Sequence, residues 1–146
     1  MVKVYTSSVI DAPADQIWAA IRDFNGLPGW VPAIAESRIE GGHPADRVGS
    51  IRILTLQDGG VIREKLLTLS DYDYQCSYSI LESPLGVRDY MAMLKLSPVT
   101  DGNRCFAEWS AEFECDAGRE GELADLIGQG VFQAAFNTLK EKAGRA

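Results

Sequence analysis

The chain has 146 residues, of which 46% are hydrophobic and 24% charged, and its formal net charge is −7. This length and composition are those of an ordinary globular domain that buries a continuous core. The acidic balance argues against nucleic acid or an anionic membrane surface as a partner, and no stretch approaches the roughly 18 apolar residues of a membrane span. We therefore expect one domain over residues 1–146, with no membrane span.

The first part of the chain predicts a strand followed by two short helical segments. Val2–Ile10 is rich in β-branched residues and ends at a turn signal that contains proline. Apolar residues at helical spacing predict an amphipathic helix over Ala14–Phe24, with Asp11 as the expected N-cap. The segment Leu27–Pro32 then predicts a second short helix or turn, which would place Trp30 at a corner.

Six strand-like runs follow, separated by turn signals rich in Gly, Pro, Asn and Asp. They are Ala33–Glu40, Val48–Leu56, Val61–Ser70, Tyr74–Glu82, Val87–Leu96 and Arg104–Cys115. The sequence QDGG at 57–60 is a strong hairpin signal between the second and third of these runs. With no repeat, linker or low-complexity segment, this order predicts an antiparallel sheet.

The last segment, Gly118–Ala146, predicts a single long helix with an apolar stripe along one face. That stripe must be buried, and the curved face of the sheet is the available surface. Gly128 and Gly130 lie inside this helix, where each costs about 1 kcal/mol relative to alanine. Such glycines are typical of close packing on a sheet. The alternative is a loosened helix that shifts over a ligand.

Strand alternation sorts the side chains into an inner and an outer face. Trp109 falls on the apolar face of its strand, and Tyr78 and Tyr90 lie on the mainly apolar faces of theirs. Arg63 and Lys65 flank Glu64 in the sequence. If these two basic side chains face the solvent, the Glu64 side chain points inward. Periodicity leaves the strand that carries Arg52 ambiguous, and a slip of one residue would invert the assignment. The hairpin favours Arg52 facing inward beside Glu64.

These assignments give one set of candidate ligand-binding residues. The set is Trp30, Arg52, Glu64, Tyr78, Tyr90 and Trp109, with Trp30 at the mouth of the pocket. A buried Arg–Glu couple is stable only when it is hydrogen-bonded, and with two phenols it would orient a carbonyl or hydroxyl group of an aromatic ligand. The alternatives are an ordinary salt bridge on the outer face of the sheet and aromatics that only fill the core.

The remaining reactive residue types do not form a recognisable motif. The three cysteines, Cys76, Cys105 and Cys115, show no CxxC spacing, and the only histidine is His43 in a loop. We therefore expect no metal site and no cofactor. The N-terminal residues lack the apolar block of a signal peptide. Together with unpaired thiols, this favours a cytoplasmic location.

Five segments spread over the whole chain carry a resemblance to a known family. They are VIDAPADQIWAAIRDFNGLPGWVP, GSIRILTLQDGGVIREKLL, YSILESPLGVRDYMAMLKLSPV, DGNRCFAEWSAEFE and the closing FNTLKEK. On these segments the chain resembles the SRPBCC superfamily of START domains, birch-pollen-allergen-like proteins and bacterial aromatic polyketide cyclases. It looks closest to the small stand-alone members that are similar to polyketide cyclases and dehydrases.

The resemblance implies an α+β helix-grip fold. In this fold a curved antiparallel sheet of about seven strands wraps around a long C-terminal helix, and two short helices follow the first strand. It also implies that a small hydrophobic ligand, lipid-like, aromatic or polyketide-like, binds in an internal cavity.

Two other functions stay open at the level of the sequence. The first is a polyketide cyclase or dehydratase that uses Glu64 as its acid/base, with Arg52 and the tyrosines stabilising an enolate. No catalytic motif decides whether the protein is an enzyme. The second is a protein-interaction module without a ligand. A homodimer is an open alternative that the sequence does not decide.

Overall fold

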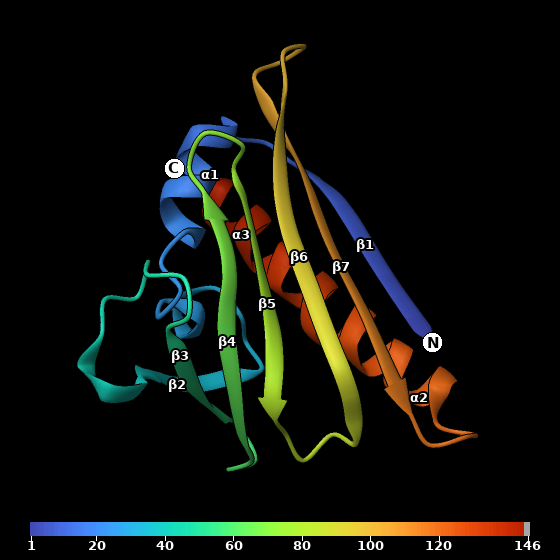
Figure 1. Ribbon diagram of the computed structural model, residues 1–146. Helices are drawn as coiled ribbons and strands as arrows, with labels where there is room; N and C mark the ends of the chain where they lie inside the picture. Colours follow the sequence, from blue (N-terminus) through green and yellow to red (C-terminus); the bar gives the residue numbers. More distant parts are fainter. Residues whose placement is uncertain (145–146) are drawn as a thin grey trace.

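The computed structural model describes residues 1–144. Its main feature is one seven-stranded antiparallel sheet (Figure 1). The strands are β1 (Val2–Ile10), β2 (Ile34–Ile39), β3 (Ile51–Leu56), β4 (Val61–Ser70), β5 (Gln75–Glu82), β6 (Val87–Val99) and β7 (Arg104–Cys115). Their order across the sheet is β1-β7-β6-β5-β4-β3-β2. Strands β2 to β7 thus form a meander, joined by short turns except for the longer connection over residues 40–50 between β2 and β3, and β1 adds to it by pairing with β7.

Two short helical segments follow β1, as the sequence predicts. Helix α1 (Ala14–Ile21) is shorter than the predicted range, and the 3₁₀ turn η1 is Leu27–Gly29. The expected cap at Asp11 is wrong. Pro13 is the N-cap, and its carbonyl oxygen accepts the first backbone hydrogen bonds of the helix. A second 3₁₀ turn, η2 (Glu40–Gly42), follows β2.

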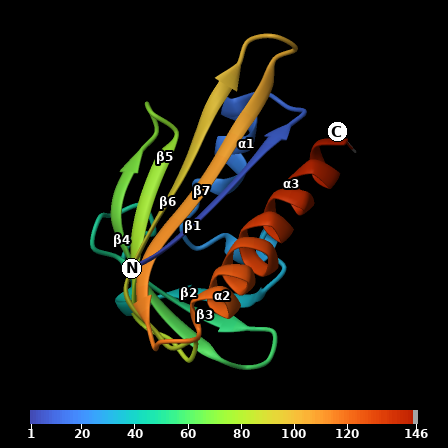
Figure 2. The same ribbon diagram turned by 90° about the vertical axis from the view of Figure 1, so that its right-hand side faces the viewer.

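The C-terminal helix lies along one side of the sheet (Figure 2). It runs through α2 (Glu120–Asp125), a π-helical segment η3 (Leu126–Gln133) and α3 (Ala134–Gly144). The predicted helix starts two residues too early, and positions 145–146 of that prediction lie outside the described residues. A curved antiparallel sheet against a long C-terminal helix confirms the predicted α+β helix-grip fold.

The two glycines of the π-helical segment differ in what surrounds them. A Cβ atom on Gly128 would lie 3.1 Å from Val4 Cγ1 of β1, and Thr6 Oγ1 donates a hydrogen bond to the Gly128 carbonyl oxygen (3.3 Å). Close packing against the sheet therefore explains Gly128. A Cβ atom on Gly130 would lie 3.6 Å from Leu126 of the same helix, so contact with the sheet does not explain Gly130.

The inner face of the sheet follows the predicted alternation on β3, on β7 and on β4 as far as Leu66, after which a register shift leaves Thr68 exposed. Arg52 lies directly opposite Glu64 in the β3–β4 register, and both are buried, which resolves the ambiguous strand. On β6 the alternation is broken. Strict alternation would place Arg88 on the same face as Tyr90. A bulge between Arg88 and Met91 leaves Arg88 exposed instead, because the extra residue turns the side chains that precede it.

Candidate functional site

A cavity of about 340 Å³ lies between the sheet and the C-terminal helix. Most of its lining is aliphatic or aromatic and comes from η1, from strands β2 to β5 and from the π-helical segment, which contributes Leu126, Ile127, Val131 and Phe132. Gln57 and Asp58 of the β3–β4 turn also border it. Its volume falls within the range of about 300–1,000 Å³ that is typical of small-molecule sites.

A buried ion pair forms one wall of this region. Arg52 Nε donates a hydrogen bond to Glu64 Oε1 (2.8 Å), and Arg52 Nη2 lies 2.6 Å from the same oxygen. Arg52 Nη1 donates to the carbonyl oxygen of Phe24 (2.9 Å). The guanidinium is stacked over the rings of Phe24 (3.9 Å) and Tyr78 (4.7 Å). Arg52 is 3% exposed and Glu64 is 5% exposed, so the pair is not on the outer face of the sheet.

Only one of the two carboxylate oxygens of Glu64 contacts Arg52. Both Arg52 nitrogens contact Oε1, and Glu64 lines the cavity, which makes Oε2 the oxygen available to a ligand. Burial raises the pKa of Glu64, and the charge and hydrogen bond of Arg52 oppose this rise without cancelling it. The carboxyl group can therefore accept a hydrogen bond as a carboxylate or donate one when protonated.

The aromatic residues of the site form a connected cluster. Trp109 Nε1 donates a hydrogen bond to the Tyr78 hydroxyl (3.1 Å). The Trp109 ring is stacked on Phe132, with ring centroids 4.2 Å apart, and the Tyr78 and Tyr90 rings are 6.4 Å apart. Burial raises the pKa of both tyrosines far above neutrality. They are therefore neutral hydrogen-bonding groups in this site rather than phenolates.

Four of the six candidate residues line the main cavity, namely Glu64, Tyr78, Tyr90 and Trp109. Arg52 and Trp30 line a second cavity of about 20 Å³ behind it. Arg52 thus reaches the main cavity only through Glu64, whose carboxylate it holds in place.

The predicted position of Trp30 at the mouth is wrong. Its side chain is 4% exposed and packs against Trp109, with ring centroids 5.4 Å apart. The end of α3 lies against the turn that carries Trp30, where Lys142 Nζ donates a hydrogen bond to the Gly29 carbonyl oxygen. The indole lines the small second cavity, and its Nε1–H finds no acceptor among residues 1–144.

Sequence reasoning missed the residues at the rim of the cavity. The sequence places Gln57 only in a turn. In the structure its side-chain amide donates a hydrogen bond to the Pro32 carbonyl oxygen (3.0 Å), and its backbone N–H donates one to the Ala33 carbonyl oxygen (3.2 Å). These bonds fix the hairpin tip beside the start of β2. Leu126 and Val131 also line the cavity, whereas helical periodicity predicts for them only a place in the apolar stripe that packs on the sheet.

Other kinds of site find little support in the described part of the chain. Residues 1–144 contain no group of three or more His, Cys, Asp or Glu side chains placed to hold a metal ion. The three cysteines are free thiols, and burial raises the pKa of Cys76 to about 11, which disfavours the reactive thiolate. Within the same residues, no helix has the length and apolar character needed to cross a membrane.

A curved sheet that holds a long helix over an apolar cavity defines the helix-grip class, to which the SRPBCC proteins belong. This chain belongs to the family described as "Polyketide cyclase / dehydrase and lipid transport", which it matches over residues 1–144. Both the predicted superfamily and the predicted fold are thereby confirmed.

Several solved bacterial structures resemble this protein along nearly its whole length. The protein XoxI from Bacillus cereus has a TM-score of 0.87 at 28% identity, covering 97% of this chain and 95% of that one. A protein from Thermobifida fusca has a TM-score of 0.89 at 26% identity, covering 99% and 95%. A protein from Nitrosospira multiformis has a TM-score of 0.82 at 27% identity, covering 99% of each chain. Among curated proteins, no significant match is found.

Proposed function

We propose that this protein binds a small hydrophobic molecule, lipid-like, aromatic or polyketide-like, in the main cavity. The observation that carries the proposal is the cavity of about 340 Å³ itself. Protein interiors are close-packed, with few voids larger than a water molecule, so a space of this size is not ordinary packing. A module that served only to contact another protein would have no need of it.

The cavity is lined by apolar side chains and by the carboxyl group of Glu64, and these two kinds of group would contribute to ligand binding in different ways. The aliphatic and aromatic side chains would supply affinity through removal of apolar ligand surface from water. Glu64 Oε2 would fix the orientation of the ligand by pairing with its hydroxyl or carbonyl group. Because this carboxyl group is buried, a ligand without a hydrogen-bonding group at that point would leave it unpaired at a cost in affinity.

Substitution of Ala33 by phenylalanine tests the cavity directly. Ala33 lines the cavity, and a phenyl ring there would occupy ligand space. We expect A33F to weaken binding of the neutral fluorescent probe 1-aminoanthracene by about tenfold or more, which corresponds to about 1.4 kcal/mol. Fluorescence titration measures the dissociation constant. Ala35, two residues further along and exposed, provides the matched control, and A35F should bind like wild type. Equal affinity in A33F and A35F would place the probe outside the cavity.

A cyclase or dehydratase is a second candidate function, and the state of Glu64 favours it. The raised pKa of this carboxyl group brings its protonated and ionised forms closer in population near neutral pH, which suits a general acid/base. The two tyrosines would stabilise the negative charge that develops on an enolate oxygen, while Arg52, which does not line the cavity, would act only by holding Glu64 in place. No metal or redox group is needed for such a proton transfer.

Replacement of Glu64 by glutamine separates catalysis from binding. The ligand would first be identified by native mass spectrometry of the protein purified from its own host. If the protein is an enzyme, E64Q should lower turnover of that compound by about 10²–10⁴-fold, the usual contribution of an acid/base group, while the amide preserves shape and binding. Product formation is followed by chromatography and mass spectrometry. Unchanged turnover in E64Q would remove Glu64 from the chemistry.

A further inference from the structure

Strands β5 and β6 are paired over only part of their length. The ladder runs from Gln75 opposite Lys95 to Ser79 opposite Met91 and then stops. Beyond it, the end of β5 pairs with β4 and the start of β6 pairs with β7. The two strands diverge toward the β5–β6 turn (Figure 1), and a groove of about 870 Å³ lies between them. We call this the β5–β6 groove.

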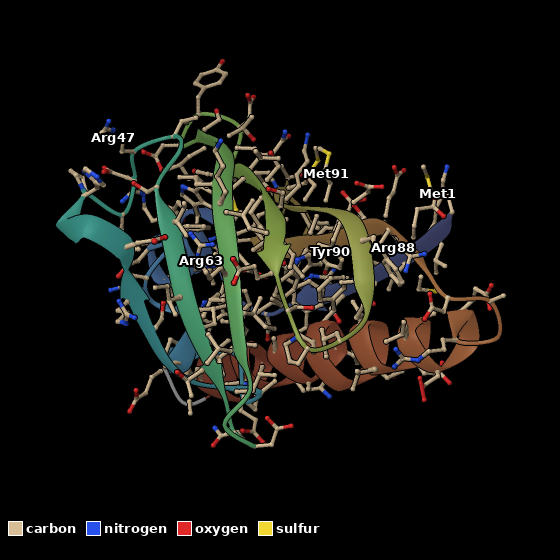
Figure 3. The ribbon with its side chains drawn as sticks, turned by 60° about the horizontal axis from the view of Figure 1, so that its bottom comes forward. Met1, Arg47, Arg63, Arg88, Tyr90 and Met91 are labelled. Carbon is tan, nitrogen blue, oxygen red and sulfur yellow. The ribbon has the colours of Figure 1, made fainter. Side chains whose placement is uncertain are left out.

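The β5–β6 groove and the main cavity share a wall. Ile80 and Tyr90 line both spaces, so these two side chains are the partition between the groove and the ligand space. Leu81, Arg88 and Met91 border the groove but not the cavity. Figure 3 shows Tyr90 between β5 and the first residues of β6, with Arg88 on the other side of β6. The ends of β5 and β6 that flank these two side chains are not joined by backbone hydrogen bonds.

The backbone beside Tyr90 is strained. Tyr90 belongs to the bulge on β6, and the preceding residue, Asp89, has φ 51°, a left-handed conformation that is costly for a residue other than glycine. Tyr90 itself faces the interior, as do Ala92 and Leu94 further along the strand. The ring lies against Phe113, with centroids 5.8 Å apart, while the β5 side offers no hydrogen-bonding ladder at this position. The β5–β6 ladder stops short of Tyr90, so an outward swing of its ring would break no backbone hydrogen bond to β5.

We propose that the β5–β6 groove is a side entrance to the ligand cavity, with Tyr90 as its gate. The inference rests on the proposed function, since it needs a ligand that enters the cavity. In the structure, Tyr90 and Ile80 separate the two spaces. An outward swing of Tyr90 into the groove would join them and admit a flat, apolar molecule between the strands. The rate of ligand exchange would then depend on free space in the groove.

Filling the groove without altering the cavity tests this route. Met91 is 54% exposed and borders the groove but not the cavity, so M91W would obstruct the swing of Tyr90 from outside. Met93 provides a matched control, because it is 41% exposed on the same face of the same strand and does not border the groove. Association and dissociation of 1-aminoanthracene are measured by stopped-flow fluorescence.

We expect M91W to slow association and dissociation by the same factor, about tenfold, because a gate changes the barrier and not the two end states. The dissociation constant should therefore stay within about twofold of wild type. M93W should bind at wild-type rates. A second variant, L81W on the opposite rim of the groove, should slow both rates in the same way. It allows the proposal to be tested even if M91W does not fold.

Each other outcome has a definite meaning. Wild-type rates in M91W and L81W, with probe binding intact, would overturn the side entrance and leave the proposed function standing. A weaker dissociation constant with unchanged association would also overturn it, because the groove would then be a contact surface for the probe. Failure of the wild-type protein to bind the probe at all would contradict the proposed function, and the entrance would fall with it.

Discussion

Replacing Arg52 by methionine is expected to lower the free energy of unfolding by about 3–5 kcal/mol, the cost of leaving one partner of a buried ion pair alone. Glu64 would lose the contacts to Arg52 Nε and Nη2, and the Phe24 carbonyl oxygen would lose its donor. Methionine keeps an apolar stem of similar length, so the loss would report on charge and hydrogen bonds more than on volume. Urea denaturation followed by circular dichroism measures it.

Two comparisons make this expectation specific. The double variant R52M/E64M removes both charges and should recover most of the lost stability, because two apolar side chains leave no buried charge unpaired. Arg63 on the same hairpin provides a surface control. It contacts both Glu40 and Glu82 but is more exposed, so R63M should cost far less than R52M, because solvent screens a surface ion pair. Equal losses for R52M and R63M would contradict the importance of burial.

The same variant should also change how stability depends on pH. Without Arg52, only the factors that raise the pKa of Glu64 remain among its named causes. In R52M the folded-state pKa would then lie further above that of the unfolded chain. The folded state would bind the extra proton, so its stability falls as pH rises from the unfolded pKa through the folded pKa. The deficit of R52M relative to wild type should therefore be smallest in acid and grow toward neutral pH.

Substitution of Trp109 by alanine is the second large effect that we expect. Trp109 is fully buried and contacts Phe132, Trp30 and Phe136, which joins the sheet to the C-terminal helix. Truncation of a buried Trp to Ala typically costs about 3–5 kcal/mol. Because Trp109 also lines the ligand cavity, W109A should enlarge that cavity. Chemical denaturation measures the first effect, and titration with apolar probes of increasing size measures the second.

Phenylalanine at the same position separates packing from hydrogen bonding. W109F keeps an aromatic ring against Phe132 but removes the Nε1 donor to the Tyr78 hydroxyl. Its cost should be well below that of alanine, near the 1–3 kcal/mol of a buried polar group that loses its partner. If W109F were as destabilising as W109A, the hydrogen bond to Tyr78 would outweigh the ring packing.

Local sequence signals were sufficient for part of the site geometry. Alternation placed Trp109 and Tyr78 on the inner face, and the hairpin turn at 57–60 fixed the register that sets Arg52 opposite Glu64. Both signals are short-range, since a turn determines which residues of its two strands face each other. The roles of these residues toward a ligand stay predictions.

Long-range packing decided what the sequence did not reveal. Trp30 is buried because its ring packs against Trp109 of β7, a residue far along the chain, and no local pattern encodes that contact. Arg88 is exposed because of the bulge at Asp89, which alternation alone cannot anticipate. The size of the cavity depends on the separation of helix and sheet, a property of the assembled core.

The position of β1 in the sheet has a consequence for folding. Strands β2 to β7 can form one hairpin at a time, because each pairs with its neighbour in the chain. By contrast, β1 pairs with β7, and Val2 lies opposite Phe113, so this ladder must close a loop that contains almost the entire meander. Closure of so long a loop carries a large entropic cost before any contact offsets it. The pairing of β1 with β7, which also provides the surface that Gly128 contacts, is therefore the natural late step in folding.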